Sequence, residues 1–534
     1  MKFPAPSPRT LVLLAVALSA AVGCTSEIAI THQSASAAGA PPACSPGARE
    51  ACYSGPSGTE GLGVCVGGHR TCLPDGSAFG PCEGEITPTL EVCSSPTDSD
   101  CDGSVGCTGA ALWSKSFGDN VQPGGIAADP AGNVFITGAF SETVDFGDGP
   151  HTSLDGYSVF VLKLDPAGEL LWSTTFGGVG SAMGSGIGAD AEGNVLFTGA
   201  FTGENLDFGG GPLDLHGGSD VFAVKLDPAG NHVWSRRVGG QHTDIALGLA
   251  VDATGGIALL GQYADGPTDL GAGSIPLAGD VGVLAVRFDS AGTLLYGAGV
   301  SGPGVDHAGG IAVNPANEVF ITGTFGKSLT FGDHTLISAD SDDVFLAELD
   351  PQGHWGWARG FGSGSADVGR GVQVTPTGTL VLTGLYTSAI DFGETAPPTN
   401  GYQPFLVELT TSGGFVAGSE YGGGKGSAYG VALAVAPAGD VVMAGHLSGP
   451  VTLQGEPLVC AGSEDIFVAK YGADHQPVWS HRFGDEAQQL VKGVAVDKAS
   501  ATLLTGTFAG TLDFGLGPLT NSAAPTMYVA KLAP

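Results

Sequence analysis

Apolar residues in the last four fifths or so of the chain gather in short runs, and one run in every copy of a repeat closes with a pair of small residues. The second residue of this pair is always glycine, and successive glycines lie 61 or 62 residues apart. Seven copies at so regular a spacing predict a repeat protein in which each copy is one structural unit. The pairs are Thr137-Gly138, Thr198-Gly199, Leu260-Gly261, Thr322-Gly323, Thr383-Gly384, Ala444-Gly445 and Thr505-Gly506.

Each copy contains four segments with the pattern of β-strands, and the first copy shows them clearly. Residues 134–140 are apolar on both faces, residues 159–165 are so except at Lys163, and residues 170–176 alternate between apolar and polar positions. A shorter segment at 125–129 precedes them. Continuous apolar strands are buried on both faces, whereas an alternating strand has one face in water. This combination predicts a four-stranded sheet stacked between similar sheets, which is a β-propeller blade.

The order of the segments predicts how the ring of blades closes. A fourth-strand pattern occurs at Trp113, before the first complete copy, and the chain finishes with the three inner strands of a copy, the last at 527–532. An open edge would leave backbone groups unpaired and apolar side chains exposed. We therefore expect residues 110–118 to run antiparallel beside residues 526–532. The expected fold over residues 109–534 is an all-β, seven-bladed propeller with 28 strands.

The first 23 residues have the pattern of a signal peptide. Lys2 and Arg9 precede an apolar run at 11–22, and this run of 12 residues is too short to span a bilayer as a stable helix.

The apolar run ends at a junction, Gly23-Cys24, which resembles the lipobox of bacterial lipoproteins, although Ala21 stands where leucine is usual. The resemblance implies that Cys24 becomes lipid-modified and is the first mature residue. Ordinary signal cleavage near Ala20 is the alternative. Residues 24–43 are rich in Ser, Ala, Thr, Gly and Pro, so we expect the lipid anchor to be followed by a flexible tether.

Eight of the ten cysteines crowd into a segment at 44–108, which we interpret as a small separate module. In an exported chain this number predicts up to four disulfides, whose pairing the sequence does not determine. A zinc site is the weaker interpretation, because no Cys-x-x-Cys pair occurs. Cys460, in the propeller, is expected to be an unpaired, partly buried thiol. The eight are Cys44, Cys52, Cys65, Cys72, Cys82, Cys93, Cys101 and Cys107.

The run from Cys52 to Cys82 resembles the cysteine-rich modules of surface lipoproteins from myxobacteria, and the tail at 91–103 resembles the metal-binding motif of that group. Within the tail, Asp98, Asp100 and Asp102 have the Asp-x-Asp-x-Asp-Gly spacing that places oxygens around Ca²⁺. An EF-hand is excluded, because its twelfth position is Gly109 rather than glutamate. A weak calcium site and an acidic solvated turn both remain open.

The repeats carry the motifs Trp-Ser-x-x-Phe-Gly-Gly, Gly-Ile-Ala-x-Asp-x-x-Gly-Asn, Asp-Phe-Gly and Phe-x-x-Lys-Leu-Asp. In these motifs they resemble bacterial SBBP-type β-propeller repeats. The resemblance covers about four fifths of the chain. It implies a propeller on an exported protein, and it implies no catalytic residue.

The charge balance excludes some classes of partner. Asp and Glu number 53 against 19 Lys and Arg, for a formal net charge of −34. So acidic a chain is repelled by nucleic acid and by anionic lipid headgroups, whereas it favours divalent cations.

Two groups of acidic residues suggest chemistry. The four Asp-Phe-Gly triplets match the kinase magnesium motif, but they recur blade by blade without a glycine-rich nucleotide loop, so we interpret them as structural. Asp244, Asp306 and Asp367 precede the first strands of three successive copies at equivalent places. Turn-capping residues of the repeat are one interpretation. A carboxylate patch that binds a cation or a sugar is the other.

Together these features favour a monomeric cell-envelope lipoprotein at the outer membrane, whose propeller binds or scaffolds an envelope protein or polysaccharide without catalysis. An enzyme acting on extracellular polysaccharide, which would need paired carboxylates, is the alternative. A purely structural component is a third possibility. Irregularity separates them, because an active site breaks the repeat with unlike polar residues in neighbouring blades. The sequence shows little of it.

Overall fold

The computed structural model describes residues 44–55, 59–87, 108–270, 274–394, 396, 399, 401–454, 456–521 and 525–534. Cys24, the tether at 24–43, the turn at 98–103 with its three aspartates, and Cys93, Cys101 and Cys107 lie outside these residues. Over the described ranges the chain is built of strands and contains no helix. Accordingly, no helix in these ranges is long and apolar enough to cross a membrane.

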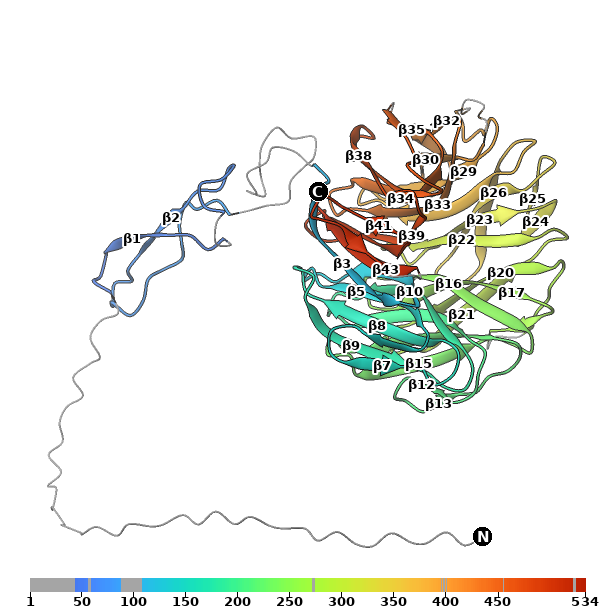
Figure 1. Cartoon of the computed structure of the whole chain (residues 1–534), viewed down its shortest axis with the longest axis horizontal. Coiled ribbons are helices and arrows are strands. Elements are labelled where there is room, and N and C mark those ends of the chain that lie inside the picture. Colours follow the sequence, from blue (N-terminus) through green and yellow to red (C-terminus); the bar gives the residue numbers. More distant parts are fainter. Residues whose placement is uncertain are drawn as a thin grey trace, which may run out of the picture. The chain divides into compact units, whose positions relative to one another are not determined.

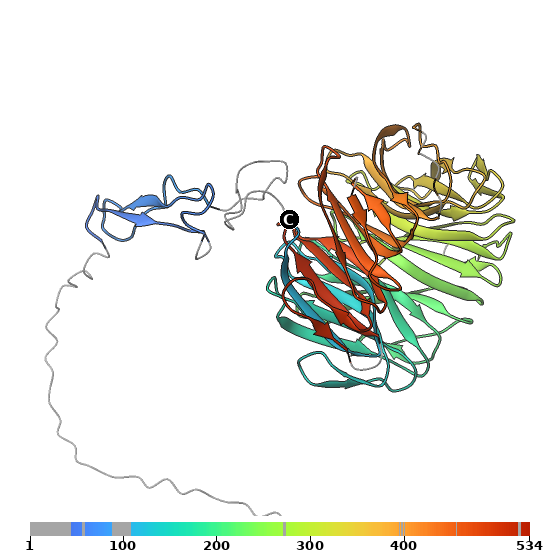
Figure 2. The ribbon, with the colours of Figure 1, turned by 45° about the horizontal axis from the view of Figure 1, so that its top comes forward.

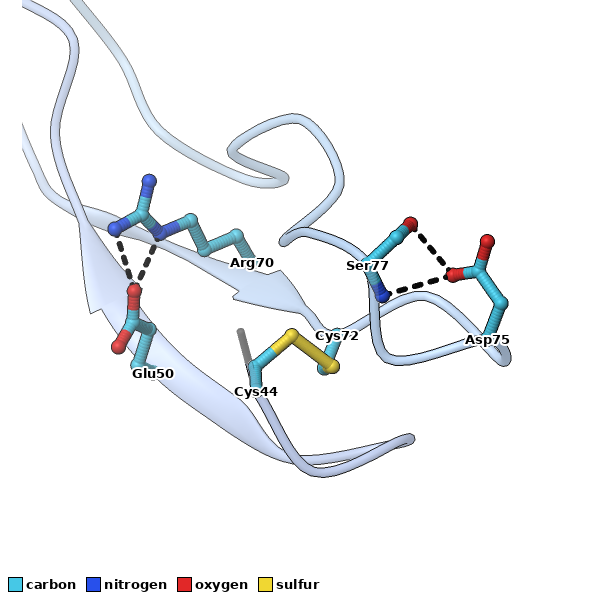
Figure 3. The surroundings of a disulfide bond; sticks show 6 residues. All are labelled: Cys44, Glu50, Arg70, Cys72, Asp75 and Ser77. Carbon is cyan, nitrogen blue, oxygen red and sulfur yellow. Dashed lines mark hydrogen bonds and ion pairs between the residues drawn. A yellow bond between two sulfur atoms is a disulfide. The ribbon is translucent and has the colours of Figure 1, made fainter. Parts of the chain in front are cut away.

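The N-terminal part, residues 44–87, is held together by disulfides. Strands β1 (Arg49–Cys52) and β2 (Gly68–Thr71) form a two-stranded sheet. The Cys44–Cys72 disulfide closes one side of it, and Arg70 pairs with Glu50 across its surface (Figure 3). Cys52, Cys65 and Cys82 are disulfide-bonded as well. All five cysteines described in this part are therefore in disulfides, which confirms the prediction of disulfides rather than zinc.

Residues 108–534 form the seven predicted four-stranded sheets, which stand side by side around a ring (Figures 1 and 2). Blade 1 contains β4 (Val121–Ala128), β5 (Val134–Phe140), β8 (Ser158–Leu164) and β9 (Leu170–Phe176). Blade 2 contains β10 (Ala182–Ala189), β11 (Val195–Phe201), β14 (Asp220–Leu226) and β15 (His232–Val238). Blade 3 contains β16 (Thr243–Val251), β17 (Ile257–Ala264), β20 (Val281–Phe288) and β21 (Leu294–Val300).

The remaining blades follow the same order. Blade 4 contains β22 (Asp306–Val313), β23 (Val319–Phe325), β26 (Asp343–Leu349) and β27 (Trp355–Phe361). Blade 5 contains β28 (Val368–Val374), β29 (Leu380–Tyr386), β30 (Gln403–Leu409) and β31 (Phe415–Tyr421). Blade 6 contains β33 (Ser427–Val435), β34 (Val441–Ser448), β37 (Asp465–Tyr471) and β38 (Pro477–Phe483).

Blade 7 is built from both ends of the propeller, as predicted. Its strands are β39 (Gln489–Val496), β40 (Thr502–Phe508), β43 (Thr526–Leu532) and, as the outer strand, β3 (Ala111–Asp119). β3 runs antiparallel to β43 with Phe117 opposite Met527. The 28 blade strands therefore close into a ring without an open edge.

Within the described residues the connection between the second and third strands contains a two-stranded ribbon in five blades, and in blade 6 it forms a three-stranded sheet together with β32 (Gly423–Gly424). Asp145 of the first Asp-Phe-Gly triplet accepts hydrogen bonds from the backbone N–H of Gly147 and Gly149, at 2.8 and 3.1 Å. Phe146 is buried, with its ring 5.1 Å from that of Phe160. This confirms the structural interpretation of the triplets. The ribbons and the three-stranded sheet are β6 (Thr143–Asp145) with β7 (Pro150–Thr152), β12 (Leu206–Asp207) with β13 (Pro212–Leu213), β18 (Thr268–Asp269) with β19 (Ser274–Ile275), β24 (Ser328–Phe331) with β25 (His334–Ile337), β35 (Val451–Leu453) with β36 (Glu456–Leu458) and β32, and β41 (Thr511–Leu512) with β42 (Leu519–Thr520).

The repeated Thr-Gly pair has a packing role. Thr137 Oγ1 donates to the Phe160 carbonyl at 2.9 Å, which ties the second strand to the third inside the blade. A Cβ added to Gly138 would lie 2.1 Å from the Gln122 carbonyl oxygen, so only glycine fits beneath the first strand. The glycine contact recurs in all seven blades, and the threonine hydrogen bond recurs in the five blades that carry Thr. The glycine contact explains the most regular feature of the sequence.

An aromatic residue of the fourth strand, which is tryptophan in five blades and Tyr296 in blade 3, joins six of the seven blades to the next. Trp172 Nε1 donates to the Pro228 carbonyl, which lies in the turn between the third and fourth strands of blade 2, at 3.2 Å. The indole covers Gly230 of that turn, whose φ of 87° favours glycine. Apolar side chains of both blades fill the rest of the interface.

Candidate functional site

The innermost strands of all seven blades line a cavity of about 420 Å³ at the axis of the ring. Each of these strands contains a β-bulge, a place where its register against the second strand shifts. Just after the bulge, six strands carry glycine. A Cβ added to Gly186 would lie 2.9 Å from Gly248 Cα, and one added to Gly310 would lie 2.8 Å from Gly371 Cα. At Gly186 and Gly310 neighbouring first strands therefore approach too closely for a side chain, and these two glycines are structural.

The bulge position itself differs from blade to blade. It holds Gly124, Ser185, Leu247, Gly309, Arg370, Val431 and Lys492 in blades 1 to 7. Arg370 and Lys492 line the axial cavity, and the second strand of blade 6 adds His446. These three residues, here named the cationic patch, all come from blades 5 to 7. Blades 1 to 4 line the cavity with glycine, isoleucine and leucine.

The local structure of blade 6 makes room for the imidazole of His446. Its register shift runs from Tyr429 to Ala432, one residue longer than in the other blades. A Cβ added to Gly430 would lie 2.6 Å from His446 Cε1, and the φ of Gly430 is 59°. Glycine is therefore required here on two counts. The imidazole stacks on the Tyr429 ring at a centroid distance of 5.9 Å.

Neither ring nitrogen of His446 forms a hydrogen bond within the described residues. Its Nε2 lies 3.8 Å from Glu464 Oε1, and its Nδ1 is buried without a hydrogen-bond partner. Burial lowers the pKa of the imidazole, Lys492 and Arg370 lower it further, and Glu464 opposes them. The ring is thus held toward its neutral form.

Arg370 and Lys492 reach solvent inside the cavity, since both side chains are exposed. Desolvation by the surrounding walls lowers the pKa of Arg370, and Tyr402 acts in the opposite direction. A guanidinium stays charged at physiological pH even so. A charged guanidinium, an ammonium and an imidazole on one side of a channel are donors suited to an anionic group.

A second cavity of about 570 Å³ extends the site toward one mouth of the channel. Leu247 and Lys492 line both cavities, so the two are adjacent. Gln122, Met183 and Gln488 supply the wider mouth. Lys492 therefore lies between the mouth and the axis.

Another cavity, of about 540 Å³, lies between blades 3 and 4 and is lined by Asp280, Asp340, Asp342 and Lys327 among others. No group of three or more His, Cys, Asp or Glu side chains within the described ranges is arranged to hold a metal ion.

The three aspartates singled out from the sequence do occupy equivalent places, but each serves its own blade. Asp244 and Asp306 lie opposite Tyr263 and Phe325 at the start of their first strands. Each carboxylate accepts a hydrogen bond from the backbone N–H four residues earlier: Asp244 from Gly240 at 2.8 Å, Asp306 from Gly302 at 2.6 Å and Asp367 from Ser363 at 2.9 Å.

All three aspartates are fully buried. Burial raises the pKa of each, to about 6 for Asp306 and Asp367. Their contacts are those of loop-capping residues, and the structure does not bring them together as an exposed patch.

Sequence reasoning missed the cationic patch. Its members do not share a motif, and a bulge has no residue preference of its own outside glycine. The signal was present in the alignment of the seven copies, where one position reads Gly, Ser, Leu, Gly, Arg, Val and Lys beside nearly invariant glycines. Such a break, with unlike polar residues in neighbouring blades, is the irregularity that we expected of an active site, and it corrects the expectation that the sequence shows little of it. A ligand-binding site breaks a repeat in the same way.

Comparison with known proteins agrees with a propeller built of repeats. No protein-family model matches the chain. A stretch of 158 residues is 27% identical to an uncharacterized WD repeat-containing protein, L264, of Acanthamoeba polyphaga mimivirus, and it covers 27% of this chain and 11% of the viral protein. The chain thus matches a small part of that relative.

Two solved structures are similar to the chain at low identity. The WD40 β-propeller domain of Doa1 is 10% identical with a TM-score of 0.41, covering 79% of this chain and 97% of that one. Virginiamycin B lyase from Staphylococcus aureus is 10% identical with a TM-score of 0.40, covering 79% and 98%. The fold assignment itself rests on the seven sheets and their closure.

Proposed function

We propose that this chain is a lipid-anchored protein of the outer cell surface and that its propeller is a non-enzymatic binding module with the central channel as ligand site. The observation that carries the proposal is the cationic patch, which breaks an otherwise regular repeat in three adjacent blades. Rigid scaffolds with variable positions around one cavity are the usual form of ligand sites.

The N-terminal part supports the proposed location. A signal-like segment ends at Cys24, and the described cysteines of residues 44–87 are in disulfides. Disulfides persist in oxidising compartments outside the cytoplasm.

The contacts of the buried carboxylates favour binding over glycoside hydrolysis. Asp343 and Asp367 lie close enough for Asp343 to raise the pKa of Asp367, as a catalytic pair would. However, both are buried, and they accept hydrogen bonds from the backbone N–H of Ala339 and Ser363. Glu464, nearer the channel, accepts a hydrogen bond from Gln488. These carboxylates are engaged in loop contacts rather than directed at a substrate.

Two experiments test the proposal. Cys24→Ala should move the protein from the membrane fraction to the soluble fraction, and equal membrane association of both forms would contradict the lipid anchor. The mature protein should bind at least one component of an array of glycans and cell-wall fragments, tested with and without Ca²⁺. Absence of any binding to the array and to isolated envelope would favour a purely structural component.

A further inference from the structure

We propose that the cationic patch, Arg370, His446 and Lys492, binds one anionic group, a carboxylate or a phosphate, on a ligand slim enough to enter the channel. This inference rests on the proposed use of the channel as ligand site and adds the chemical class of the ligand.

The two cations of the patch differ from all the others in the blades. Within the described propeller, every other lysine or arginine on a blade strand has a protein partner. Lys225 pairs with Asp190 at 2.8 Å and Lys531 with Asp497 at 2.8 Å. Lys163 donates to the Pro228 carbonyl at 3.0 Å. The remaining partnered residues are Lys115, Arg236, Arg237, Arg287, Arg359, Lys470 and Arg482.

Arg370 and Lys492 form neither an ion pair nor a hydrogen bond with any described residue, although 53 acidic residues are present in the chain. A fold that pairs its cations so consistently leaves these two directed into one cavity. An anionic group from outside the chain would complete their coordination.

His446 supplies the third donor and is placed for that purpose by changes in two strands. Blade 6 has both the longer bulge with Gly430 and a histidine on its second strand. The equivalent residue of blade 1 is Ala139 and that of blade 2 is Ala200. The unpartnered Nδ1 of His446 is buried, and its Nε2 faces Glu464. An imidazole that gains a proton adds a positive charge between Glu464 and a bound anion.

The shape of the channel restricts the ligand. Blades 1 to 4 line the channel with glycine and aliphatic side chains, so the polar contacts lie on one side only. The cavity of about 420 Å³ accepts a single sugar acid or a phosphate rather than a folded segment. The wider mouth at Gln122 and Gln488 leaves space for the rest of a longer ligand.

Binding should depend on pH in a definite direction. The groups that face His446 are Glu464, Lys492, Arg370 and the stacked Tyr429 ring. In the free protein burial and the two cations hold the imidazole pKa low. A bound anion offsets those cations and raises this pKa, so ligand binding and proton uptake favour each other. For galacturonate, whose carboxylate stays ionised over this range, affinity should therefore increase as the pH falls from 8 to 6.

The test uses the mature full chain and isothermal titration calorimetry. The probes are inorganic phosphate and galacturonate, with galactose as the neutral control. We expect at least one anion to bind and galactose not to bind. Phosphate alone, galacturonate alone or both would each support the inference, and would identify the group that the natural ligand carries.

Variants distinguish binding at the cationic patch from a general effect of positive charge on the protein. Arg370→Gln and Lys492→Gln, whose side chains are exposed in the channel, should weaken anion binding at least tenfold with unchanged melting temperature. Lys498→Gln, at an exposed site in the turn between β39 and β40, is the matched control and should leave binding unchanged. His446→Asn should remove the increase in affinity between pH 8 and pH 6. Failure of both anions to bind, or equal binding by Arg370→Gln, would overturn the inference. A ligand from the glycan and cell-wall array that binds Arg370→Gln as well as it binds the unmodified protein would also overturn the inference. It would leave the proposed binding function intact.

Discussion

Trp113 and Lys531 lie opposite each other in the antiparallel pair of β3 and β43, and both donate to the same carbonyl oxygen, that of Pro166 in blade 1. The distances are 3.0 Å from Trp113 Nε1 and 3.2 Å from Lys531 Nζ. Trp172 and Lys163 donate to the Pro228 carbonyl of blade 2 in the same way. The ring is thus closed by the contact that joins its other blades.

The chain ends complete the remaining interface. Trp479 Nε1 donates to the Pro534 carbonyl at 3.3 Å, and its ring covers Gly109. Gly109 N–H in turn approaches the Pro534 carbonyl at 3.4 Å. In blade 7 two ends of the propeller therefore form the turn that a continuous segment forms elsewhere.

Closure can be tested by a disulfide across β3 and β43. Ser114 lies opposite Ala530, and both are small residues. Ser114→Cys with Ala530→Cys should form a disulfide on mild oxidation, detected as faster migration on non-reducing gels and by mass spectrometry. Ser114→Cys with Ala469→Cys, which pairs with Ser480 in blade 6, is the control and should stay reduced. A folded protein in which the first pair stays reduced would contradict the closed ring.

Trp113→Ala should also destabilise the ring. Trp113 is half-buried rather than fully buried, so the cost should lie below the 3–5 kcal/mol or so of a fully buried tryptophan.

The closed ring could be predicted because each of its parts has a local signature. Three features recur at fixed spacing: the Thr-Gly pair, the fourth-strand tryptophan and the turn glycine. Each makes a packing contact within its own blade or with the next one. The side chains that line the channel could not be predicted in this way. Arg370 stands at a β-bulge, and the equivalent positions of other blades hold side chains of different kinds. Proximity of Arg370, His446 and Lys492 also depends on ring closure, which brings together residues far apart in the sequence.

A second prediction concerns the charge pair inside the blades. In blades 2, 3 and 7 a third-strand cation pairs with an aspartate of the turn between the first two strands, as Lys225 does with Asp190. In blade 4 the two positions hold Glu348 and Asn314. Glu348 is buried, and burial, aided by Glu318 and Asp350, raises its pKa to about 7.

The folded-state pKa of Glu348 thus lies above its unfolded value of 4.5, so ionisation opposes folding. The penalty is absent below about pH 4.5 and complete above about pH 7. Glu348→Gln should therefore stabilise the protein at pH 8, on the order of 2–3 kcal/mol, and change little at pH 4.5. Chemical denaturation at both pH values measures this. Glu408→Gln is the matched control in blade 5: Glu408 pairs with His475 at 2.5 Å, so its loss should destabilise. Destabilisation by Glu348→Gln at pH 8 would show that Glu348 has a favourable partner.

The loop-capping aspartates predict the pH dependence of the whole propeller. Burial raises the pKa of Asp306, Asp343 and Asp367 to about 6, above the ordinary value of 3.8. Between these values the folded state binds more protons than the unfolded state, so stability falls as the pH rises through this window. The melting temperature should be higher at pH 5.5 than at pH 8.

Replacing two of the carboxylates isolates their share of this effect. Asp306→Asn with Asp367→Asn should flatten the difference between pH 5.5 and pH 8. Asp190→Asn should instead destabilise at both, because the Lys225 partner and hydrogen bonds from Asn194 lower the pKa of Asp190 against the effect of burial. A melting temperature that rises from pH 5.5 to pH 8 would contradict the assignment of these buried acids.

The last prediction concerns the one interface within the described propeller in which the fourth strand lacks an aromatic residue at the tryptophan position. Opposite Glu408 the fourth strand of blade 5 carries Ala417, where other blades have an aromatic residue. The turn of blade 6 that an indole would cover carries His475 in place of glycine, with φ of 64°. Its Nε2 pairs with Glu408, and its Nδ1 lies 2.7 Å from Ser419 Oγ. The histidine therefore fills the space that the alanine leaves. A small residue on the fourth strand is compensated by a large residue in the turn.

A double-mutant cycle tests this exchange. Ala417→Trp alone should clash with His475, and His475→Gly alone should leave a gap and a buried Glu408 without its imidazole partner. Each change should cost roughly 1–3 kcal/mol. With both changes the indole covers a glycine as in the other blades, so the double variant should recover at least about 1 kcal/mol of the summed loss. Trp357→Ala, in the adjacent interface over Gly413, gives the cost of losing an indole that the repeat already contains. Additive losses in the double variant, measured by chemical denaturation, would mean that Ala417 and His475 do not substitute for the Trp-Gly contact.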